Sequence, residues 1–419
     1  MRLIIVSQHF CPDSFRINDI AFALCEQGHQ VRVITGLPDY DAGTVPPAYR
    51  RFRKRREMLR GVEVIRLPTT PRRSGPVWRL INYVSFAVAG WLYASFVRRG
   101  AGADAVLCYQ TSPVSQAIPA ARLARRFRCP HLLYCLDLWP ESMKVWGLNE
   151  RSPVYRAVTR ASGRIYRAAD LLAVCSRPFE RYLIETHGVD PARLHYLPQH
   201  CEALFDEVAG QYEDNGVTDF LFAGNVGTAQ DVPCILRAAA LLRDRPGRAP
   251  AFHVHIVGGG SELDAMRALG AELGLQALVT FHGRLPLEEM PAYYRLADAF
   301  LLTLAGDSFV GQTLPGKLQS YMSAGKPVVA AVNGAAAELL AEAGCGYCAA
   351  ASDAEGLARC MIEVMGDVSQ ARALGERARA YYVQHFRREV FLERLTELIQ
   401  EAKKLKQSAL QTQGGHTHV

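Results

Sequence analysis

The stretch Thr313-Leu-Pro-Gly-Lys-Leu-Gln-Ser-Tyr-Met-Ser-Ala-Gly-Lys-Pro-Val-Val329 decides the class of fold. A Pro-Gly pair opens a short helix, Gly325 ends it, and the β-branched pair Val328-Val329 begins a buried strand directly afterwards. A helix N-terminus presents free backbone N–H groups and a partial positive charge, and Lys317 lies in its first turn. This helix start is therefore predicted to bind a diphosphate group.

Short apolar strands alternate with amphipathic helices in the first half of the chain. The predicted strands are Leu3–Ser7, Val31–Thr35, Val62–Leu67, Ala105–Tyr109, Leu132–Leu136 and Leu171–Cys175. The predicted helices are Asn18–Gln27, Val77–Arg98, Pro113–Arg126, Pro153–Ala168 and Pro178–Thr186. Strands this apolar, separated by helices, are typical of a parallel sheet with helices on both faces.

The same alternation starts again after a polar, weakly periodic segment at residues 198–219. Five more strands are predicted, over Phe220–Ala223, Phe252–Val257, Leu278–Phe281, Phe300–Leu304 and Pro327–Ala331. We expect two doubly wound α/β domains, at residues 1–205 and 206–385, followed by a helix at 386–405 and a disordered tail at 406–419. Two such domains in tandem are expected to leave a cleft between the carboxyl ends of their strands.

Composition places the chain among globular proteins, because 49% of its 419 residues are hydrophobic and 21% are charged. The net charge of +7 fits nucleic acid, a phosphorylated small molecule or an anionic membrane surface equally well. The 11 cysteines, most of them in apolar runs, indicate reduced thiols in a cytoplasmic protein. Cys345 and Cys348 form a Cys-x-x-Cys motif, but the second cysteine pair that a zinc site needs is missing. The strand at the N-terminus does not resemble a signal peptide.

A second phosphate-binding candidate follows the first strand of the second domain, in Phe222-Ala-Gly-Asn-Val-Gly-Thr-Ala-Gln-Asp231. Strand, glycine loop and helix start come in the order that a phosphate-binding turn needs. A tight turn without any ligand fits the same pattern. The Pro315–Lys317 segment favours the phosphate interpretation, because two such elements in one domain indicate a single diphosphate site.

Both segments resemble the donor-binding elements of retaining glycosyltransferases with the GT-B fold, of the family 4 type. The sequence of the glycine loop is similar to that of the corresponding loop in a bacterial subgroup that includes O-antigen, colanic acid and amino-sugar (fucosamine) transferases. The resemblance covers almost the whole chain and implies two Rossmann-like domains that face a cleft. The N-terminal domain would bind the acceptor and the C-terminal domain the nucleotide sugar, and the last helix would return to the first domain. It also implies donor contacts from Gly224, Asn225, Gln230, Pro315 and Gly316.

Three further residues are implied by resemblance to the family's site. Phe281-His-Gly-Arg284 resembles the loop that packs on the nucleotide base, where Arg284 either faces the phosphates or is simply solvated. Tyr134–Ser142 resembles the family's Asp-Leu-Trp-Pro-Glu-Ser segment, which places Asp137 at a strand end, facing sugar hydroxyls, unless it caps a helix. Arg16 would lie at a helix N-terminus in a loop that lines the cleft opposite the donor.

The sequence departs from the wider family at the two positions of its Glu-x7-Glu pattern, which hold Gln312 and Ser320. A carboxylate can accept two hydrogen bonds from a ribose diol, which Ser320 cannot replace fully, whereas Gln312 can both donate and accept. Asn225 and Gln230 replace an arginine–lysine pair, so Lys317 must carry more of the phosphate charge. The resemblance implies a subgroup that shares these changes, and we therefore expect activity.

Asp39-Tyr-Asp41 matches the Asp-x-Asp metal motif of the other large glycosyltransferase fold, but a match of three residues has little specificity. The resemblance implies a metal-independent reaction without cofactor, in which cationic groups and helix N–H donors stabilise the leaving diphosphate. The predicted catalytic residues are then Asp137, Lys317 and Arg16.

A basic run and a charge-free run lie close together in the first half of the chain. Residues 50–60 hold seven arginines and lysines, and Leu80–Val97 is uncharged and long enough to span a bilayer. The second run is interpreted in three ways: a helix buried in the first domain, an interfacial helix resting on the membrane, or a true span. Binding of nucleic acid by the basic run is less favoured, because no nucleic-acid module is recognised.

These features together predict a retaining glycosyltransferase that uses a UDP- or GDP-linked sugar. Its acceptor is expected to be a lipid-linked or growing glycan in O-antigen or exopolysaccharide biosynthesis, at the inner face of the bacterial plasma membrane. A nucleotide-sugar epimerase of the same architecture is one alternative, which would need no acceptor or membrane. A non-catalytic scaffold of a polysaccharide assembly complex is another, because the two glutamates are missing.

Overall fold

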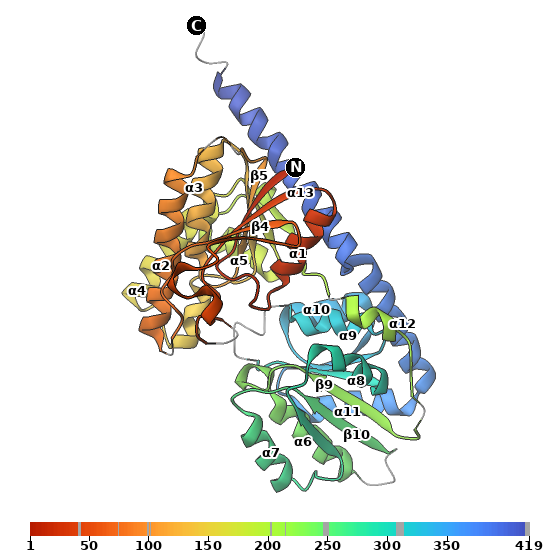
Figure 1. Cartoon of the computed structure of the whole chain (residues 1–419). Coiled ribbons are helices and arrows are strands. Elements are labelled where there is room, and N and C mark those ends of the chain that lie inside the picture. Colours follow the sequence, from red (N-terminus) through yellow and green to blue (C-terminus); the bar gives the residue numbers. More distant parts are fainter. Residues whose placement is uncertain are drawn as a thin grey trace. The chain divides into compact units, whose positions relative to one another are not determined.

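The computed structural model describes residues 1–40, 43–73, 75–98, 100, 102–201, 203–213, 215–245, 251–306 and 314–414. The chain forms two compact units (Figure 1). Unit 1 comprises Met1–Leu197 and Leu392–Val419, and unit 2 comprises Pro198–Phe391. Each unit has a central sheet with helices packed on it, which confirms the predicted class of two α/β domains.

Unit 1 is built on an eight-stranded sheet with the order β3-β4-β2-β1-β5-β6-β7-β8. Only β3 is antiparallel to its neighbour. The strands are β1 (Arg2–Val6), β2 (Gln30–Thr35), β3 (Arg56–Leu59), β4 (Val62–Arg66), β5 (Ala105–Gln110), β6 (His131–Cys135), β7 (Leu171–Val174) and β8 (Leu194–Tyr196). Every residue of β5, β6 and β7 is buried, as expected for a parallel sheet that is covered on both faces.

The helices of unit 1 connect these strands. They are α1 (Arg16–Glu26), α2 (Pro76–Phe96), α3 (Ala117–Phe127), α4 (Pro153–Arg167), α5 (Arg177–His187) and the short η1 (Pro47–Phe52), η3 (Val114–Gln116), η4 (Glu141–Trp146) and η5 (Pro191–Arg193). Helices α2 and α3 lie side by side (Figure 1). Their close approach requires Gly90, because a Cβ atom there would lie 2.7 Å from the Cβ of Pro119.

The last helix, α13 (Arg388–Gly414), contributes to unit 1 from Leu392 onward. Lys406 Nζ lies 3.0 Å from Asp170 Oδ1, which fixes the helix to the loop before β7. The helix extends past residue 405, where we predicted that a disordered tail would begin. Lysine, leucine, glutamine and alanine dominate this stretch, and all four favour helix.

Unit 2 contains a parallel six-stranded sheet with the order β11-β10-β9-β12-β13-β14. The strands are β9 (Thr218–Ala223), β10 (Phe252–Val257), β11 (Val279–Gly283), β12 (Ala299–Thr303), β13 (Val328–Ala331) and β14 (Gly346–Ala349). The helices are η6 (Ala203–Val208), η7 (Thr228–Gln230), α6 (Val232–Arg243), α7 (Leu263–Glu272), η8 (Leu287–Glu289), α8 (Met290–Leu296), α9 (Gly316–Ser323), α10 (Gly334–Ala343), α11 (Ala354–Gly366) and α12 (Val368–His385).

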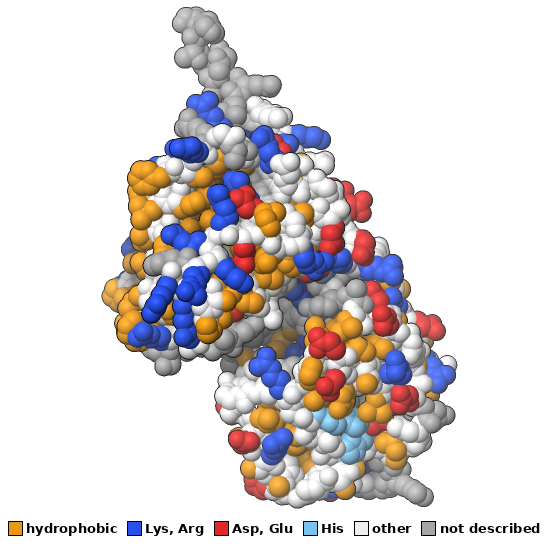
Figure 2. All heavy atoms as spheres, viewed as in Figure 1, with side chains coloured by type: hydrophobic (Ala, Val, Ile, Leu, Met, Phe, Trp, Pro, Cys, Tyr) orange, Lys and Arg blue, Asp and Glu red, His pale blue; other side chains and the backbone are white. Residues whose placement is uncertain are grey.

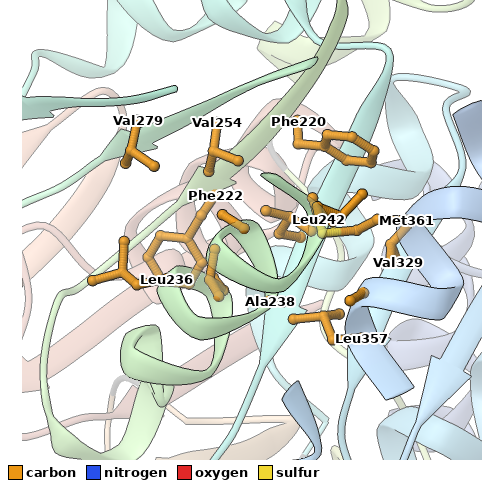
Figure 3. Packing of buried hydrophobic residues seen from close by; sticks show 14 of the residues in the cluster. Phe220, Phe222, Leu236, Ala238, Leu242, Val254, Val279, Val329, Leu357 and Met361 are labelled. Carbon is orange, nitrogen blue, oxygen red and sulfur yellow. The ribbon is translucent and has the colours of Figure 1, made fainter. Parts of the chain in front are cut away.

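The core on one side of this sheet consists of alternate strand residues and the facing helices (Figure 3). Phe222 of β9 and Val254 of β10 are fully buried together with Leu236 of α6. Burial of each such side chain stabilises the fold by roughly 1.5–3 kcal/mol. This packing places the carboxyl ends of the neighbouring strands β9 and β10 side by side, and a glycine turn follows each of them.

Candidate active site

The ammonium group of Lys317 is the most unusual charged group in unit 2. Lys317 is the second residue of α9, and its buried Nζ has no hydrogen-bond partner within the described parts of the chain. The nitrogen lies 4.1 Å from the centroid of the Phe222 ring. Burial lowers the pKa of Lys317 to about 7, because the charged form has lost its water. A buried ammonium group with an aromatic contact but no hydrogen-bond partner indicates a place where a bound anion supplies the missing contacts.

Glycine turns bring the backbone close to this ammonium group. Gly224 follows β9, and a Cβ atom there would lie 3.1 Å from Lys317 Nζ. After β10, a Cβ atom on Gly258 would lie only 1.7 Å from the carbonyl oxygen of Gly224. Sequence reasoning identified the turn at Gly224 but missed the run Gly258–Gly260, although three glycines directly after a strand were a usable signal.

Tyr321 fixes α9 against the end of β9. Its hydroxyl oxygen accepts a hydrogen bond from the backbone N–H of Ala223 at 2.9 Å and donates to the carbonyl oxygen of the same residue at 3.0 Å. This double contact holds Lys317 opposite Gly224. Nothing in the sequence distinguishes Tyr321 from an ordinary buried aromatic residue, and it was not among the predicted site residues.

The remaining predicted donor residues fall into three groups. Asn225 and Gln230 lie near Gly224 and contact one another, with Asn225 Nδ2 donating to Gln230 Oε1 at 3.2 Å. Arg284 is exposed and adjoins the second glycine turn, since a Cβ atom on Gly259 would lie 3.3 Å from its Cβ. Pro315 and Gly316 stand at the start of α9, as predicted.

The two positions of the missing glutamates have different outcomes. The Ser320 hydroxyl donates to the carbonyl oxygen of Lys317 at 2.8 Å and lies 2.9 Å from the hydroxyl oxygen of Tyr294. Through these two contacts, Ser320 helps to hold α9 in place within unit 2. Gln312, the other position, lies outside the described residues.

Asp137 is the central polar group in the loops that follow the strands of unit 1. Its carboxylate accepts hydrogen bonds from the hydroxyls of Ser112, after β5, and Ser142, in η4. Burial raises the pKa of Asp137, while these hydrogen bonds oppose the rise. Helix η4 has Pro140 as its N-cap and no side-chain cap, so Asp137 does not cap it. Its carboxylate is therefore held by two hydroxyls within unit 1.

Arg16 lies on the same edge of the unit 1 sheet. It is the first residue of α1, as predicted, and it is half-buried. Cys175 follows β7, and burial raises the pKa of its thiol, with Arg16 lowering it and Asp137 raising it. The charges of Arg16 and Asp137 therefore both act on the loop after β7.

His9, Asp13 and Asp39 are buried together, with potential metal-ligand atoms within 4.8 Å of one another. The Asp13 carboxylate accepts the backbone N–H groups of Asp39 and Tyr40, each at 3.2 Å. Burial raises the pKa of Asp39 to about 6. These carboxylates are already engaged by backbone N–H donors, which favours a structural role. Asp41, the second residue of the predicted Asp-x-Asp motif, lies outside the described residues.

The predicted charge-free run forms most of α2, and its polar residues Asn82 and Ser85 face inward, whereas Ser95 makes an exposed contact with Arg122. Asn82 Oδ1 accepts from Gln8 Nε2 at 2.7 Å, Asn82 Nδ2 donates to the Thr70 carbonyl at 2.6 Å, and Ser85 Oγ accepts from Thr70 N at 2.9 Å. The large side chains of the opposite face are more than a third exposed: Val77, Trp78, Leu80, Ile81, Val84, Val88, Trp91, Leu92 and Phe96. The interpretation as a buried helix therefore holds for one face only.

Basic side chains lie beside this apolar face of α2 (Figure 2). Arg73 lies over the ring of Trp78 and Arg122 over that of Trp91, at 4.5 and 5.6 Å from the ring centroids. Among the described helices, none combines the length and the hydropathy needed to cross a bilayer. This finding argues against the interpretation of Leu80–Val97 as a true span.

Comparisons with known proteins match each unit to a glycosyltransferase model. Residues 14–200 match the model described as "Glycosyl transferase 4-like domain", and residues 207–381 match "Glycosyl transferases group 1". The putative colanic acid biosynthesis glycosyl transferase WcaI of Escherichia coli K12 is 25% identical over 78% of this chain and 82% of that protein. The D-inositol 3-phosphate glycosyltransferase of Nocardia farcinica is 29% identical, but the chain spans only 52% of its length.

Solved structures show a similar fold. Sucrose-phosphate synthase from Thermosynechococcus elongatus matches with a TM-score of 0.73 and 18% identity, over 96% of this chain and 98% of that one. HepE of Anabaena, in complex with UDP and glucose, matches with a TM-score of 0.65 and 15% identity, over 96% of this chain and all of that one. At these identities the likeness concerns the fold alone.

Proposed function

The chain belongs to the glycosyltransferases of the GT-B fold, and we propose that it transfers a sugar from a UDP- or GDP-linked donor with retention and without a metal ion. The acceptor is a lipid-linked or growing glycan in O-antigen or exopolysaccharide biosynthesis. The buried, unpartnered ammonium group of Lys317 carries this proposal. The similarity to WcaI supports a role in polysaccharide assembly, and the UDP bound to HepE supports the class of donor.

Lys317 is the group that we assign to the donor diphosphate. A diphosphate next to its nitrogen raises the lysine's pKa from about 7 and keeps the ammonium group charged. The partial positive charge at the start of α9 adds to this charge. Both interactions strengthen as the bond from sugar to diphosphate breaks, so they lower the barrier rather than only improving binding.

The remaining steps need no dedicated base. The sugar develops oxocarbenium character, and the departing phosphate oxygen takes the proton of the acceptor hydroxyl, which attacks from the same face. Arg284 is assigned to the phosphates in unit 2. In unit 1, Asp137 is assigned to the hydroxyls of the transferred sugar or the acceptor, with Arg16 as a further cation.

The apolar face of α2 and the basic run at residues 50–60, which includes parts of η1 and all of β3, support peripheral attachment to the inner face of the plasma membrane. Near an anionic surface each basic residue contributes about 1 kcal/mol, and an exposed apolar helix face adds to that attraction. We expect the protein to pellet with phosphatidylglycerol vesicles at low salt and to be released by carbonate. Changing Arg53, Lys54, Arg55 and Arg56 together to serine should weaken pelleting. Failure of the wild type to pellet at low salt would contradict attachment.

Thermal unfolding in the presence of a panel of nucleotide sugars tests the proposed donor class. A ligand that binds only the native state raises the midpoint, by an amount equivalent to about 2.7 kcal/mol when present at 100 times its dissociation constant. We expect a shift with at least one UDP- or GDP-sugar, and none with it in a Lys317→Met variant. Absence of any shift across the panel would contradict the proposal.

A further inference from the structure

A pocket of about 410 Å³ opens in unit 1 between α2, the basic run and the loops that follow β2 and β4. Its walls include Leu37, Val45, Tyr49 and Pro68, and the charged residues that line it are two arginines. No carboxylate is among its described lining residues. Apolar walls with a few convergent polar groups are typical of sites for small ligands, and both arginines give this site an anion preference.

The two arginines are Arg50 and Arg51, and they differ from three nearby arginines that have a glutamate partner. Arg56, Arg60 and Arg66 each form an ion pair with a glutamate. Arg50 and Arg51 are exposed and form no ion pair within the described ranges. The Nε of Arg50 donates to the Val45 carbonyl at 2.9 Å, which holds its guanidinium group at the pocket. Two neighbouring, uncompensated guanidinium groups are suited to a phosphate.

The pocket reaches α2 at Ser85, one helical turn before the exposed side chain of Val88. Ser85 lines the pocket, and its neighbours Val84 and Val88 are 51% and 52% exposed. An aliphatic chain that leaves the pocket beside Ser85 is therefore within one helical turn of exposed apolar side chains. The lining residues Leu37 and Pro68 follow β2 and β4, at the sheet edge that also carries the loop of Asp137 after β6. Strand spacings place the ends of β2 and β6 about 14 Å apart, which leaves room for a sugar between them.

We propose that this pocket binds the phosphate-bearing head of the acceptor lipid, which rests on the proposed function. Arg50 and Arg51 bind the phosphate or diphosphate, and the apolar walls bind the first carbons of the lipid chain. The rest of the chain runs along α2 into the bilayer, while the glycan extends along the sheet edge toward Asp137.

A pair of double variants distinguishes binding at this site from general electrostatic attraction of anions by the basic run. Arg50→Gln with Arg51→Asn removes the pocket charges, and Arg53→Gln with Lys54→Asn removes two charges that do not line the pocket. Arg51 and Lys54 both have a left-handed backbone, with φ of 53° and 50°, which asparagine tolerates. The two variants thus remove the same number of charges and make the same backbone demand, although Lys54 lies over the ring of the pocket residue Tyr49.

Calorimetric titration with farnesyl diphosphate, without vesicles and below its micelle concentration, is the test. We expect the wild type and the Arg53/Lys54 variant to bind equally, and the Arg50/Arg51 variant to bind at least about tenfold more weakly. Inorganic diphosphate and farnesol should each bind more weakly than farnesyl diphosphate. Both variants should weaken pelleting with phosphatidylglycerol vesicles to the same extent.

Several results would overturn the proposal. These are absence of binding by the wild type, equal weakening in both variants, farnesol binding as tightly as farnesyl diphosphate, or displacement of farnesyl diphosphate by UDP. Donor-induced thermal shifts, measured on the same samples, test the proposed function separately. If no nucleotide sugar shifts unfolding but farnesyl diphosphate binds as expected, the proposed transferase activity fails while the lipid-phosphate site stands.

Discussion

Replacing Lys317 by methionine should remove donor binding and at the same time make unit 2 more stable. Burial lowers the pKa of Lys317 from 10.5 to about 7. A lysine with this difference between its unfolded and folded pKa destabilises the native state by about 4 kcal/mol at pH 7. The unfolded chain binds more protons than the native state between pH 7 and 10, so this penalty shrinks as pH rises through that range. Methionine is similar in length, uncharged and suited to the space beside Phe222.

We expect Lys317→Met to gain between about 1 and 4 kcal/mol at pH 7. For a unit of this size each kcal/mol raises the unfolding midpoint by about 2–4 °C. Lys326→Met is the matched control, because Lys326 is also buried, with a pKa lowered to about 8, but its Nζ donates to the carbonyl oxygens of Arg295 and Ala297. The control should lose stability, since two buried acceptors lose their donor.

The assay is urea unfolding of the wild type and both variants at pH 7 and pH 10. The gain of Lys317→Met should be present at pH 7 and much smaller at pH 10. If Lys317→Met instead loses stability as Lys326→Met does, its ammonium group has a structural partner. The assignment of Lys317 to an anion site would then be wrong.

Three further predictions concern the same chemistry. Donor binding should take up a proton, because a diphosphate raises the Lys317 pKa from about 7. Calorimetric heats of binding at pH 8 should therefore differ between Tris and HEPES buffers, and equal heats would mean that binding does not change the charge of the lysine. Tyr321→Phe removes both contacts with Ala223 and should weaken donor binding by about tenfold with a loss of roughly 1–3 kcal/mol of stability, and unchanged binding would show that α9 is positioned without it. Transfer should survive excess EDTA, whereas complete loss that magnesium or manganese restores would assign a metal to His9, Asp13 and Asp39.

Most strands were predictable from the sequence because central parallel strands are continuous apolar runs. All eleven predicted strands are present, with ends that differ by at most two residues. The three missed strands, β3, β8 and β14, each lie at the edge of a sheet. These strands lack a long buried run: β3 alternates exposed and half-buried residues, β8 has only three residues, and no residue of the four in β14 is fully buried. The periodicity that identifies a buried strand is therefore absent there.

The candidate site was predictable where the chemistry is local and hidden where tertiary contacts decide it. The helix start at Lys317 and the turn at Gly224 follow from neighbouring residues. Burial of the lysine depends on Tyr321, which joins two elements that are almost a hundred residues apart in the chain. The outward direction of the apolar face of α2 depends on the contacts of Asn82 with Gln8 and Thr70, which no local pattern reveals.

The most direct test of the proposed transferase is proton NMR of the reaction with a nucleotide sugar from the thermal-shift panel and a lipid-linked glycan. We predict a new glycosidic bond whose anomeric configuration equals that of the donor, in the presence of EDTA, and no such product with Lys317→Met. An inverted product, or an epimerised nucleotide sugar without a new glycosidic bond, would contradict the account.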